Sequence, residues 1–447
     1  MLCKKRCDAQ GVVVSSDLLH DTFRTLLDVT NNKMPHLQEL VDKGEFFHQV
    51  HALNIIRSVL RDSQVTFESG PLVEATLVTV LNLYGSVRWP VQNAATATFA
   101  TILGRYVAWR QARRSEEASV IKSSVNGMTP AEFFSRFPRM HKLLKEKIDH
   151  ILTGGANQPN LGTKASRQTS LYAILVLLSR LLPSRMESPK DQHVEQAFLP
   201  VVRQCCTSSD MMVRTMAARA LVPLVSSRDF HDFITEQLIN AIPNQDSTAP
   251  LNYNSLHGIL LQIQILLRGH EPLMFFAEAK TTLYEDILPR LLPKLWLISD
   301  PRSVPAVSSV LLDIISEFVT GVNQPHRQQF LQQTREKCVG FKQLSEQGVE
   351  LAKHVLARPA TGLSVQNLIL NYNARRLAAA ILVHNAFELK SGNATELVLE
   401  LMIDPAYEVR LLAVNVVNEH LRKWKTVAKS SLLIDVTPIQ ALVLSRL

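Results

Sequence analysis

Apolar residues recur three and four positions apart along nearly the whole chain, and no other feature of the sequence constrains the fold as strongly. In "VHALNIIRSVLRD", four apolar residues fall on one face of a helix: Leu53, Ile56, Val59 and Leu60. The stretches "LVEATLVTVLNLY", "NSLHGILLQIQILL" and "NARRLAAAILVHNAFEL" have the same spacing. Few segments alternate with the period of two that is typical of a strand. The sequence therefore predicts an all-α protein.

Breaks that carry proline or glycine divide this pattern into segments of one long or two shorter helices, as at "LPSRMESPKDQ", "IPNQDSTAPLN" and "TGVNQPHR". About twenty helices with short links can form either a compact bundle or a stacked solenoid. The longest break, residues 153–170, indicates a loop or a joint between subdomains. We therefore expect helical repeats over residues 1–152, a loop over 153–170, and further helical repeats over 171–447.

A short motif that occurs three times favours the solenoid. It consists of a valine followed by arginine or glutamine, an alanine three residues after that pair, and a large apolar residue four positions further on. The distances between the copies are near three and five units of about 40 residues, which is a typical period of helical repeats. The copies are Val91-Gln92 with Ala95 and Phe99, Val213-Arg214 with Ala217 and Leu221, and Val409-Arg410 with Ala413 and Val417.

This motif resembles the signature of the HEAT repeat. There, an aspartate caps the second helix of each pair, a small residue lets the paired helices approach closely, and Asp and Arg link successive repeats. The resemblance implies a HEAT/armadillo-like α-solenoid of stacked antiparallel helix pairs. Asp210, and Asp404 followed by Pro405, are placed to cap helices. We expect Arg214 and Arg410 to be structural and to bridge repeats, with contact to a ligand as the alternative.

Nothing in the sequence indicates catalysis. Glycine is scarce, at 16 of 447 residues, whereas nucleotide-binding α/β enzymes need glycine at their phosphate loops. The sequence contains no P-loop, dinucleotide-binding, nucleophile-elbow or zincin motif. His48 and His51 form an HxxH pair, but no third metal ligand is evident, so we interpret them as an ordinary pair on a helix face. We expect a non-catalytic protein with no catalytic, cofactor-binding or metal-binding residues.

Cysteine usage and hydropathy point to a location inside the cell. The five cysteines include no CxxC pair, which favours a reducing compartment. We expect the adjacent Cys205 and Cys206 to pack as small apolar side chains. No secretory signal is evident. The most apolar run, "LYAILVLLSRLLP", is far shorter than the roughly 20 residues that a membrane span needs. We therefore expect a soluble, cytoplasmic protein with no membrane segment.

A local concentration of positive charge favours an anionic partner. Between Arg105 and Lys147, ten lysines and arginines stand against four glutamates, in a chain of formal net charge +8. Tyr106 and Trp109 lie in the same stretch and could stack on bases. The functional interpretation is a surface that follows phosphates, and the alternative is a solvated cationic face partly neutralised by the glutamates. The candidate RNA- or partner-binding residues are Arg105, Arg110, Arg113, Arg114, Arg136, Arg139, Lys142 and Lys145.

Four segments closely resemble the THADA family and occur in the family's order. They are "FFHQVHALNIIRSVLRDSQV", "VRWPVQNAATATFATILGRYV", "MTPAEFFSRFPRMHKLL" and "LNYNSLHGILLQIQILL". The resemblance implies an α-solenoid that is the non-catalytic partner of a Rossmann-fold, S-adenosylmethionine-dependent tRNA 2′-O-ribose methyltransferase. It further implies that the pair methylates the ribose at position 32 of the tRNA anticodon loop. In that arrangement the enzyme brings the cofactor site and the solenoid binds and orients the tRNA.

The chain resembles the C-terminal portion of a longer family member, because the HALN segment lies only a few dozen residues after Met1. An RRSAG-type motif precedes that segment in the family, whereas "ARRSEEAS" follows it here and lacks the final Ala-Gly. Two other interpretations stay open. One is a generic HEAT-repeat scaffold that binds a protein partner and has no RNA role. The other is an enzyme whose active site the sequence does not reveal.

Overall fold

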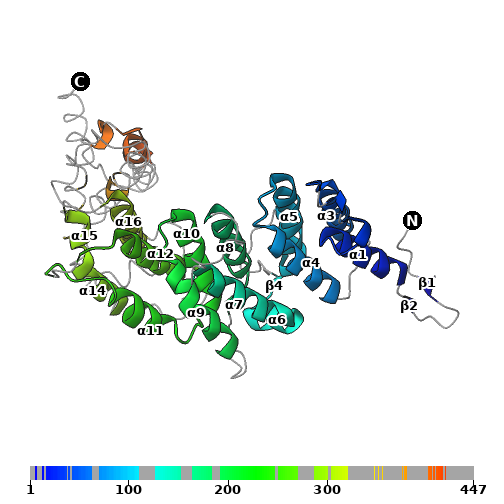
Figure 1. Cartoon of the computed structure of the whole chain (residues 1–447). Coiled ribbons are helices and arrows are strands. Elements are labelled where there is room, and N and C mark those ends of the chain that lie inside the picture. Colours follow the sequence, from blue (N-terminus) through cyan, green and yellow to red (C-terminus); the bar gives the residue numbers. More distant parts are fainter. Residues whose placement is uncertain are drawn as a thin grey trace, which may run out of the picture. The chain divides into compact units, whose positions relative to one another are not determined.

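The computed structural model describes most of the first 320 residues (Figure 1). The chain divides into two compact units, Met1–Phe230 and His231–Leu447. In both, the described residues are mostly helical. The described ranges are 6–7, 13–14, 17–37, 39–40, 43–62, 70–109, 126–152, 164–183, 192–246, 250–269, 286–300 and 304–320, with scattered positions between 347 and 418.

The first unit is a stack of helix pairs in two rows (Figure 1). In one row α1 contacts α4, α4 contacts α7 and α7 contacts α9; in the other row α3 contacts α5 and α8 contacts α10. The pairs that join the rows are α1 with α3, α4 with α5, α7 with α8, and α9 with α10. The bounds are α1 Asp17–Thr30, α3 Phe47–Arg61, α4 Gly70–Leu83, α5 Trp89–Ile102, α6 Pro130–Arg136, α7 Pro138–Leu152, α8 Lys164–Leu178, α9 Gln192–Cys205 and α10 Met211–Leu221.

This stacking confirms the predicted all-α solenoid, in which each pair buries its apolar faces against its neighbours. Among the described residues, strands occur only as two antiparallel pairs of two residues each. Pairing this short is a local contact within a connecting segment and does not change the fold class. The pairs are β1 Arg6–Cys7 with β2 Val13–Val14, and β3 Ala108–Trp109 with β4 Asn126–Gly127.

The second unit contains further packed helices. Helix α12 contacts the π-helical segment η4 and helix α16, α15 contacts α16, and α14 contacts η4. Pro293, in the first turn of η7, lacks the N–H that would continue α14, which ends at Leu291. Across the part of the chain that the structure describes, no helix has the length and apolar character needed to cross a bilayer. The bounds are α11 Phe230–Asp232, η4 Phe233–Ile239, α12 Tyr253–Gly269, α14 Leu288–Leu291, η7 Leu292–Lys294, α15 Trp296–Ser299 and α16 Pro305–Thr320.

The three copies of the sequence motif bury the same positions. The valine of each copy is at most 2% exposed, and the alanine is 0% exposed in all three. A side chain no larger than a methyl group at the alanine position allows the neighbouring helix to approach, so a larger residue there would overpack the contact. The buried residues are Val91, Val213 and Val409, with Ala95, Ala217 and Ala413.

The turn before each motif also has one geometry. Five residues before the valine, a side-chain oxygen accepts a hydrogen bond from the backbone N–H two residues further on, as is typical of Asx and Ser/Thr turns. These bonds satisfy donors at the start of the following helix. The acceptors are Ser86, Ser208 and Asp404, whose oxygens lie 3.2, 3.2 and 2.8 Å from the nitrogens of Arg88, Asp210 and Ala406.

In two copies the arginine of the motif folds back onto this turn. Arg214 Nη1 donates to the carbonyl of Ser208 at 2.7 Å, and Arg410 Nη1 donates to the carbonyl of Asp404 at 2.6 Å. Each arginine thus stabilises the turn that leads into its own helix. Bridging of successive repeats by these two arginines stays a prediction.

Asp210 and Asp404 hold different places in the motif. Asp404 occupies the turn position that Ser208 fills in the other copy, whereas Asp210 lies two residues later. Asp210 caps α10 by accepting the N–H of Met212 at 2.8 Å. Asp404 also binds Arg375, with Nη2 and Oδ2 2.6 Å apart and both side chains buried. In this part of the chain an Asp–Arg link therefore exists, and it involves Arg375.

The prediction of a loop through residue 170 is wrong for its last part. Helix α8 begins at Lys164, so residues 164–170 are helical, and residues 153–163 lie outside the described residues. Along the sequence, the boundary between the two compact units lies between Phe230 and His231, which is outside this break.

Candidate nucleic-acid interface

Helix α7 presents cations to solvent because its apolar residues lie on the opposite face. Met140, Leu144 and Ile148 are fully buried at four-residue spacing. Three cations recur at three-residue spacing on the side of the helix away from these buried residues, so they share the outer face. These exposed residues are Arg139, Lys142 and Lys145.

A buried carboxylate fixes the start of α7. Glu74 on α4 is 6% exposed, and its Oε1 accepts the backbone N–H of Arg139 at 2.7 Å. The first N–H groups of a helix have no partner within the helix, and a carboxylate near them is favoured by the helix dipole. Glu74 thus holds the first turn of α7 against α4 and sets where the Arg139 side chain begins.

Replacing Glu74 by alanine should lower the free energy of unfolding by about 1–3 kcal/mol, because it leaves a donor at the start of α7 unpaired. Chemical denaturation followed by circular dichroism measures this. The control is E132A: Glu132 accepts the N–H of Thr129 at 2.9 Å in an exposed capping box at the start of α6. We expect the control to cost about 1 kcal/mol or less. An equal effect of the two variants would contradict the role given to Glu74.

The buried side of α7 also carries a histidine within an aromatic cluster. The His141 ring lies edge-on to Phe134 of α6 and Phe198 of α9, with centroid distances of 5.3 and 5.2 Å. Phe134 and Phe198 are stacked on each other. Burial, with a smaller contribution from the charge of Lys145, lowers the pKa of His141. The cluster therefore favours the neutral imidazole.

Since the pKa of His141 is lowered in the folded state, its contribution to the free energy of unfolding is complete above its ordinary value of 6.5. That contribution should decrease as the pH falls from 6.5 through the folded pKa, because the unfolded chain then binds more protons. The variant H141F keeps an aromatic ring and does not titrate. We expect denaturation midpoints to show H141F gaining stability relative to wild type as the pH falls. Parallel pH curves would show that His141 does not contribute.

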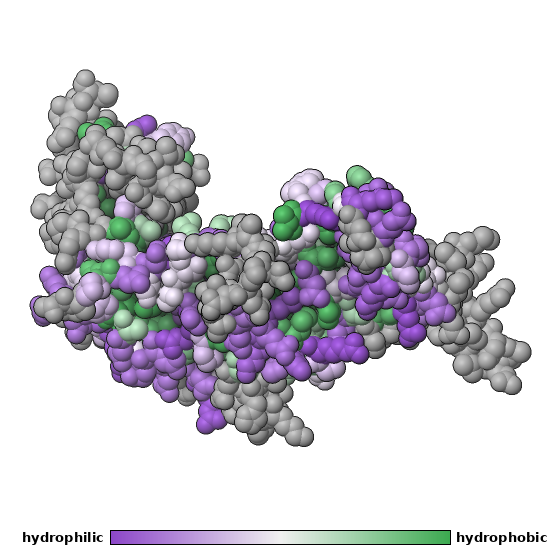
Figure 2. Space-filling model, in the orientation of Figure 1, coloured by the Kyte–Doolittle hydropathy of each residue, from purple (hydrophilic) through white to green (hydrophobic). Residues whose placement is uncertain are grey.

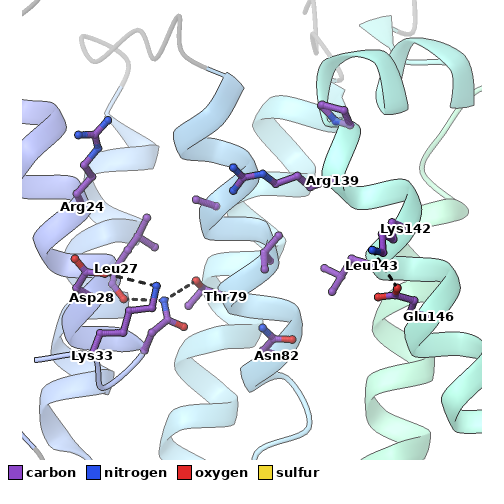
Figure 3. Close-up of a pocket in the computed structure, with 14 residues that line it drawn as sticks. Arg24, Leu27, Asp28, Lys33, Thr79, Asn82, Arg139, Lys142, Leu143 and Glu146 are labelled. Atoms are coloured by element: carbon purple, nitrogen blue, oxygen red, sulfur yellow. Dashed lines mark hydrogen bonds and ion pairs between the residues drawn. The ribbon is translucent and has the colours of Figure 1, made fainter.

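A groove of about 860 Å³ lies between α1, α4 and α7 (Figure 3). Its lining includes the apolar side chains of Leu27, Val78 and Leu143, one from each helix. Asn31 Nδ2 donates to Thr79 Oγ1 at 3.0 Å and so joins α1 to α4 along the groove. Three helices that are neighbours in one row of the stack therefore form its walls.

The lining of the groove is positively charged, with four cations and two carboxylates. Lys33 Nζ lies 3.8 Å from Asp28 Oδ1, and Lys142 Nζ lies 3.8 Å from Glu146 Oε1. All four side chains are exposed, and exposed pairs at this distance contribute little to stability. Both lysines can therefore exchange these partners for another anion at small cost.

The other two cations are arginines on opposite walls. Arg24 on α1 and Arg139 on α7 are exposed and form no ion pair with any residue that the structure describes. In Figure 3 the Arg139 side chain extends from α7 towards α4. Figure 2 shows mainly hydrophilic surface over α1 and α4, with small apolar areas between. Guanidinium groups so placed suit phosphate, which they can bind with two hydrogen bonds.

Only part of the predicted basic surface converges on this groove. Arg139 and Lys142 line it, whereas Lys145 is exposed further along α7 and does not. Arg136 is exposed on α6, with its guanidinium 5.6 Å from the centre of the Phe137 ring. Three other candidates, Arg110, Arg113 and Arg114, lie outside the described residues.

Arg105 is engaged inside the protein. Its Nη1 donates to the carbonyls of Leu60 at 2.5 Å and Asp62 at 2.6 Å, at the end of α3. Helix ends leave carbonyls without partners, and a cation there is also favoured by the helix dipole. These bonds account for Arg105 without a ligand.

Sequence reasoning missed two of the four groove cations. Arg24 and Lys33 lie about a hundred residues before α7, in a segment with no concentration of charge. They meet Arg139 and Lys142 only because α1, α4 and α7 stack in one row. The helices α1, α4 and α7 are each the first of a pair, and comparing the charges at their exposed positions could have identified Arg24 and Lys33 as neighbours of Arg139 and Lys142.

His48 of the HxxH pair and the adjacent cysteines have structural explanations. His48 Nε2 lies 2.7 Å from Asn32 Oδ1, and burial lowers its pKa, with a smaller effect of the Arg88 charge. Within the described ranges no three His, Cys, Asp or Glu side chains gather as a metal site would require. Cys205 and Cys206 are buried, as predicted, and burial raises the pKa of Cys205 to about 12, so its thiol stays protonated.

Comparison with known proteins identifies the lineage. The family model described as "THADA/TRM732, DUF2428" matches residues 7–90, and the one described as "Trm732, C-terminal TPR repeats" matches residues 92–266. Together they cover more than half of the chain in consecutive order. The chain belongs to the THADA/Trm732 family. The groove combines both matched regions, because α1 and α4 fall in the first and α7 in the second.

Curated relatives agree with this assignment. The chain is 29% identical to the tRNA (32-2′-O)-methyltransferase regulator THADA of Canis lupus familiaris, over 71% of the chain and 16% of the relative. It is 23% identical to the tRNA (32-2′-O)-methyltransferase regulator trm732 of Schizosaccharomyces pombe, over 91% of the chain and 25% of the relative. The chain thus spans a sixth to a quarter of the length of these relatives.

Proposed function

We propose that this chain is a non-catalytic scaffold that supports 2′-O-ribose methylation at position 32 of the tRNA anticodon loop. In this proposal it binds the tRNA and a partner S-adenosylmethionine-dependent methyltransferase, which supplies the cofactor site and performs the reaction. The relatives are named as regulators of such an enzyme, which supports a regulatory role for the region they share with this chain.

The observation that carries the RNA part of the proposal is the cationic groove of α1, α4 and α7. A polyanion gains affinity by replacing counterions with fixed lysines and arginines, and the groove offers four of them along one recess. Contacts of this type position an RNA without reading its bases. That suits a scaffold whose partner enzyme selects the atom to be methylated.

Reconstitution tests the proposal directly. The chain is combined with the tRNA (32-2′-O)-methyltransferase, S-adenosylmethionine and unmodified tRNA, and ribose methylation in the anticodon loop is scored by mass spectrometry. We expect methylation to increase when the chain is added to the enzyme, and none when the chain is present alone. No increase over enzyme alone would overturn the scaffold role, and methyl transfer by the chain alone would show that it is an enzyme.

A further inference from the structure

Large apolar side chains are exposed at one end of the first helix pairs. Phe47, the first residue of α3, is 62% exposed, and Val87 and Trp89, at the start of α5, are 79% and 69% exposed. Several large apolar side chains exposed together, with Trp89 among them, indicate a binding surface. These residues belong to neighbouring helices, since α3 and α5 pack against each other.

Arg88 joins the two groups of side chains. Its guanidinium lies 5.4 Å from the centre of the Phe46 ring, and Phe46 is stacked on Phe47 with the ring centres 5.1 Å apart. The result is a surface of exposed rings with a cation among them. We call Phe46, Phe47, Val87, Arg88 and Trp89 the aromatic edge.

The aromatic edge adjoins one end of the cationic groove. Asn32, next to the groove residue Lys33, lies 2.7 Å from Nε2 of His48, which directly follows Phe47. On the neighbouring helix, the groove residue Asn82 precedes Val87 by one short turn. The ends of α1 and α4 thus carry the groove residues Lys33 and Asn82, and the helices that follow them begin with the exposed rings of Phe47 and Trp89.

We propose that the aromatic edge stacks unpaired nucleobases of an RNA strand whose phosphates lie in the groove. Exposed rings accept the face of any base, and a cationic groove beside them follows the backbone, which is the combination that single-stranded nucleic acids need. Bases are free to stack in this way only where the RNA is unpaired, as in a loop. This inference rests on the RNA binding of the proposed function and adds that the bound strand is single-stranded.

Binding of short RNAs to the purified chain tests the inference. The probes are an adenine oligomer and an RNA duplex of the same length, followed by fluorescence anisotropy at several salt concentrations. We expect W89A and F47A each to weaken binding of the oligomer about tenfold or more, without changing the salt dependence. Binding of the duplex should stay as in wild type. The variant W89F keeps a ring and should retain most of the affinity.

Met211 provides a matched control, because it precedes Val213 as Trp89 precedes Val91 and is also exposed, at 48%. M211A should bind the oligomer like wild type. A second readout is intrinsic fluorescence: the oligomer should quench the emission of wild type, and W89F should lose most of that quenching.

The outcomes separate this inference from the proposed function. If W89A and F47A bind the oligomer like wild type while substitution of Arg139 and Lys142 weakens binding, stacking is overturned and RNA binding by the groove stands. If the aromatic variants keep RNA affinity but lose association with the methyltransferase, the edge is a protein-docking surface and the inference is wrong. If wild type binds neither RNA, both the inference and the RNA part of the proposed function fail.

Discussion

Replacing Asp404 by alanine is expected to lower the free energy of unfolding of the second unit by about 3–5 kcal/mol. The change leaves the guanidinium of Arg375 buried without its carboxylate, in a pair whose side chains are only 6% and 7% exposed. It also removes the acceptor for the N–H of Ala406. Hydrogen exchange of the amides of residues 409–415, measured with intact protein, should show the loss as faster exchange.

Three comparison variants separate the effect of the charge from that of the turn. D404N keeps an oxygen for Ala406 and removes the charge, so it should still lose most of the stability if the ion pair dominates. S208A alters the equivalent turn position in the first unit, where the acceptor is a hydroxyl, and should cost only about 1 kcal/mol. In the double variant R375M/D404N no buried charge remains, so part of the loss should be recovered. Equal losses for D404A and S208A would contradict this account.

The fold could be predicted because one physical requirement recurs along the chain. Stacked helix pairs need an apolar residue and a small residue at fixed places, and Val213 with Ala217 shows both in the sequence and is buried in the structure. The requirement is met locally within each helix, so helical spacing reveals it. This requirement can be recognised without knowing which distant segments of the chain pack against each other.

The polar part of the motif was less predictable because different side chains perform the same task. Ser208 and Asp404 both accept the N–H two residues on, although one is a hydroxyl and the other a carboxylate. Matching residue types would pair Asp404 with Asp210, which instead caps its helix at a position two residues later. Turn geometry reveals the equivalence, and residue identity conceals it.

The groove was only half predictable for a related reason. Arg139 and Lys142 lie in a stretch of concentrated charge, and this local signal found them. Arg24 and Lys33 join them through stacking of α1, α4 and α7, which spacing along the chain does not show. Arg105 lies in the charged stretch but donates to carbonyls at the end of α3. Carbonyls at a helix end have no partner within the helix, so they attract a guanidinium just as an RNA phosphate would.

Reversing the four groove cations, in R24E/K33E/R139E/K142E, is expected to weaken tRNA binding by more than about a hundredfold at low salt. Each lysine or arginine that meets a phosphate of a single strand contributes about 0.7 to the magnitude of the slope of log K against log salt concentration. If all four meet phosphates, the magnitude of the slope should decrease by about 3. Filter binding or fluorescence anisotropy over a series of salt concentrations measures both quantities.

Net charge alone would also weaken binding to a polyanion, so the control must change charge equally at another place. The exposed arginines Arg61, Arg180, Arg219 and Arg228 lie in the same unit and do not line the groove. Their replacement by glutamate lowers the net charge by the same amount, and we expect only a small loss of affinity with most of the salt dependence kept. If both quadruple variants lose affinity and slope to the same extent, binding follows the charge of the unit as a whole. Loss confined to the groove variant would place the RNA backbone between α1, α4 and α7, because only fixed cations in contact with phosphates displace counterions.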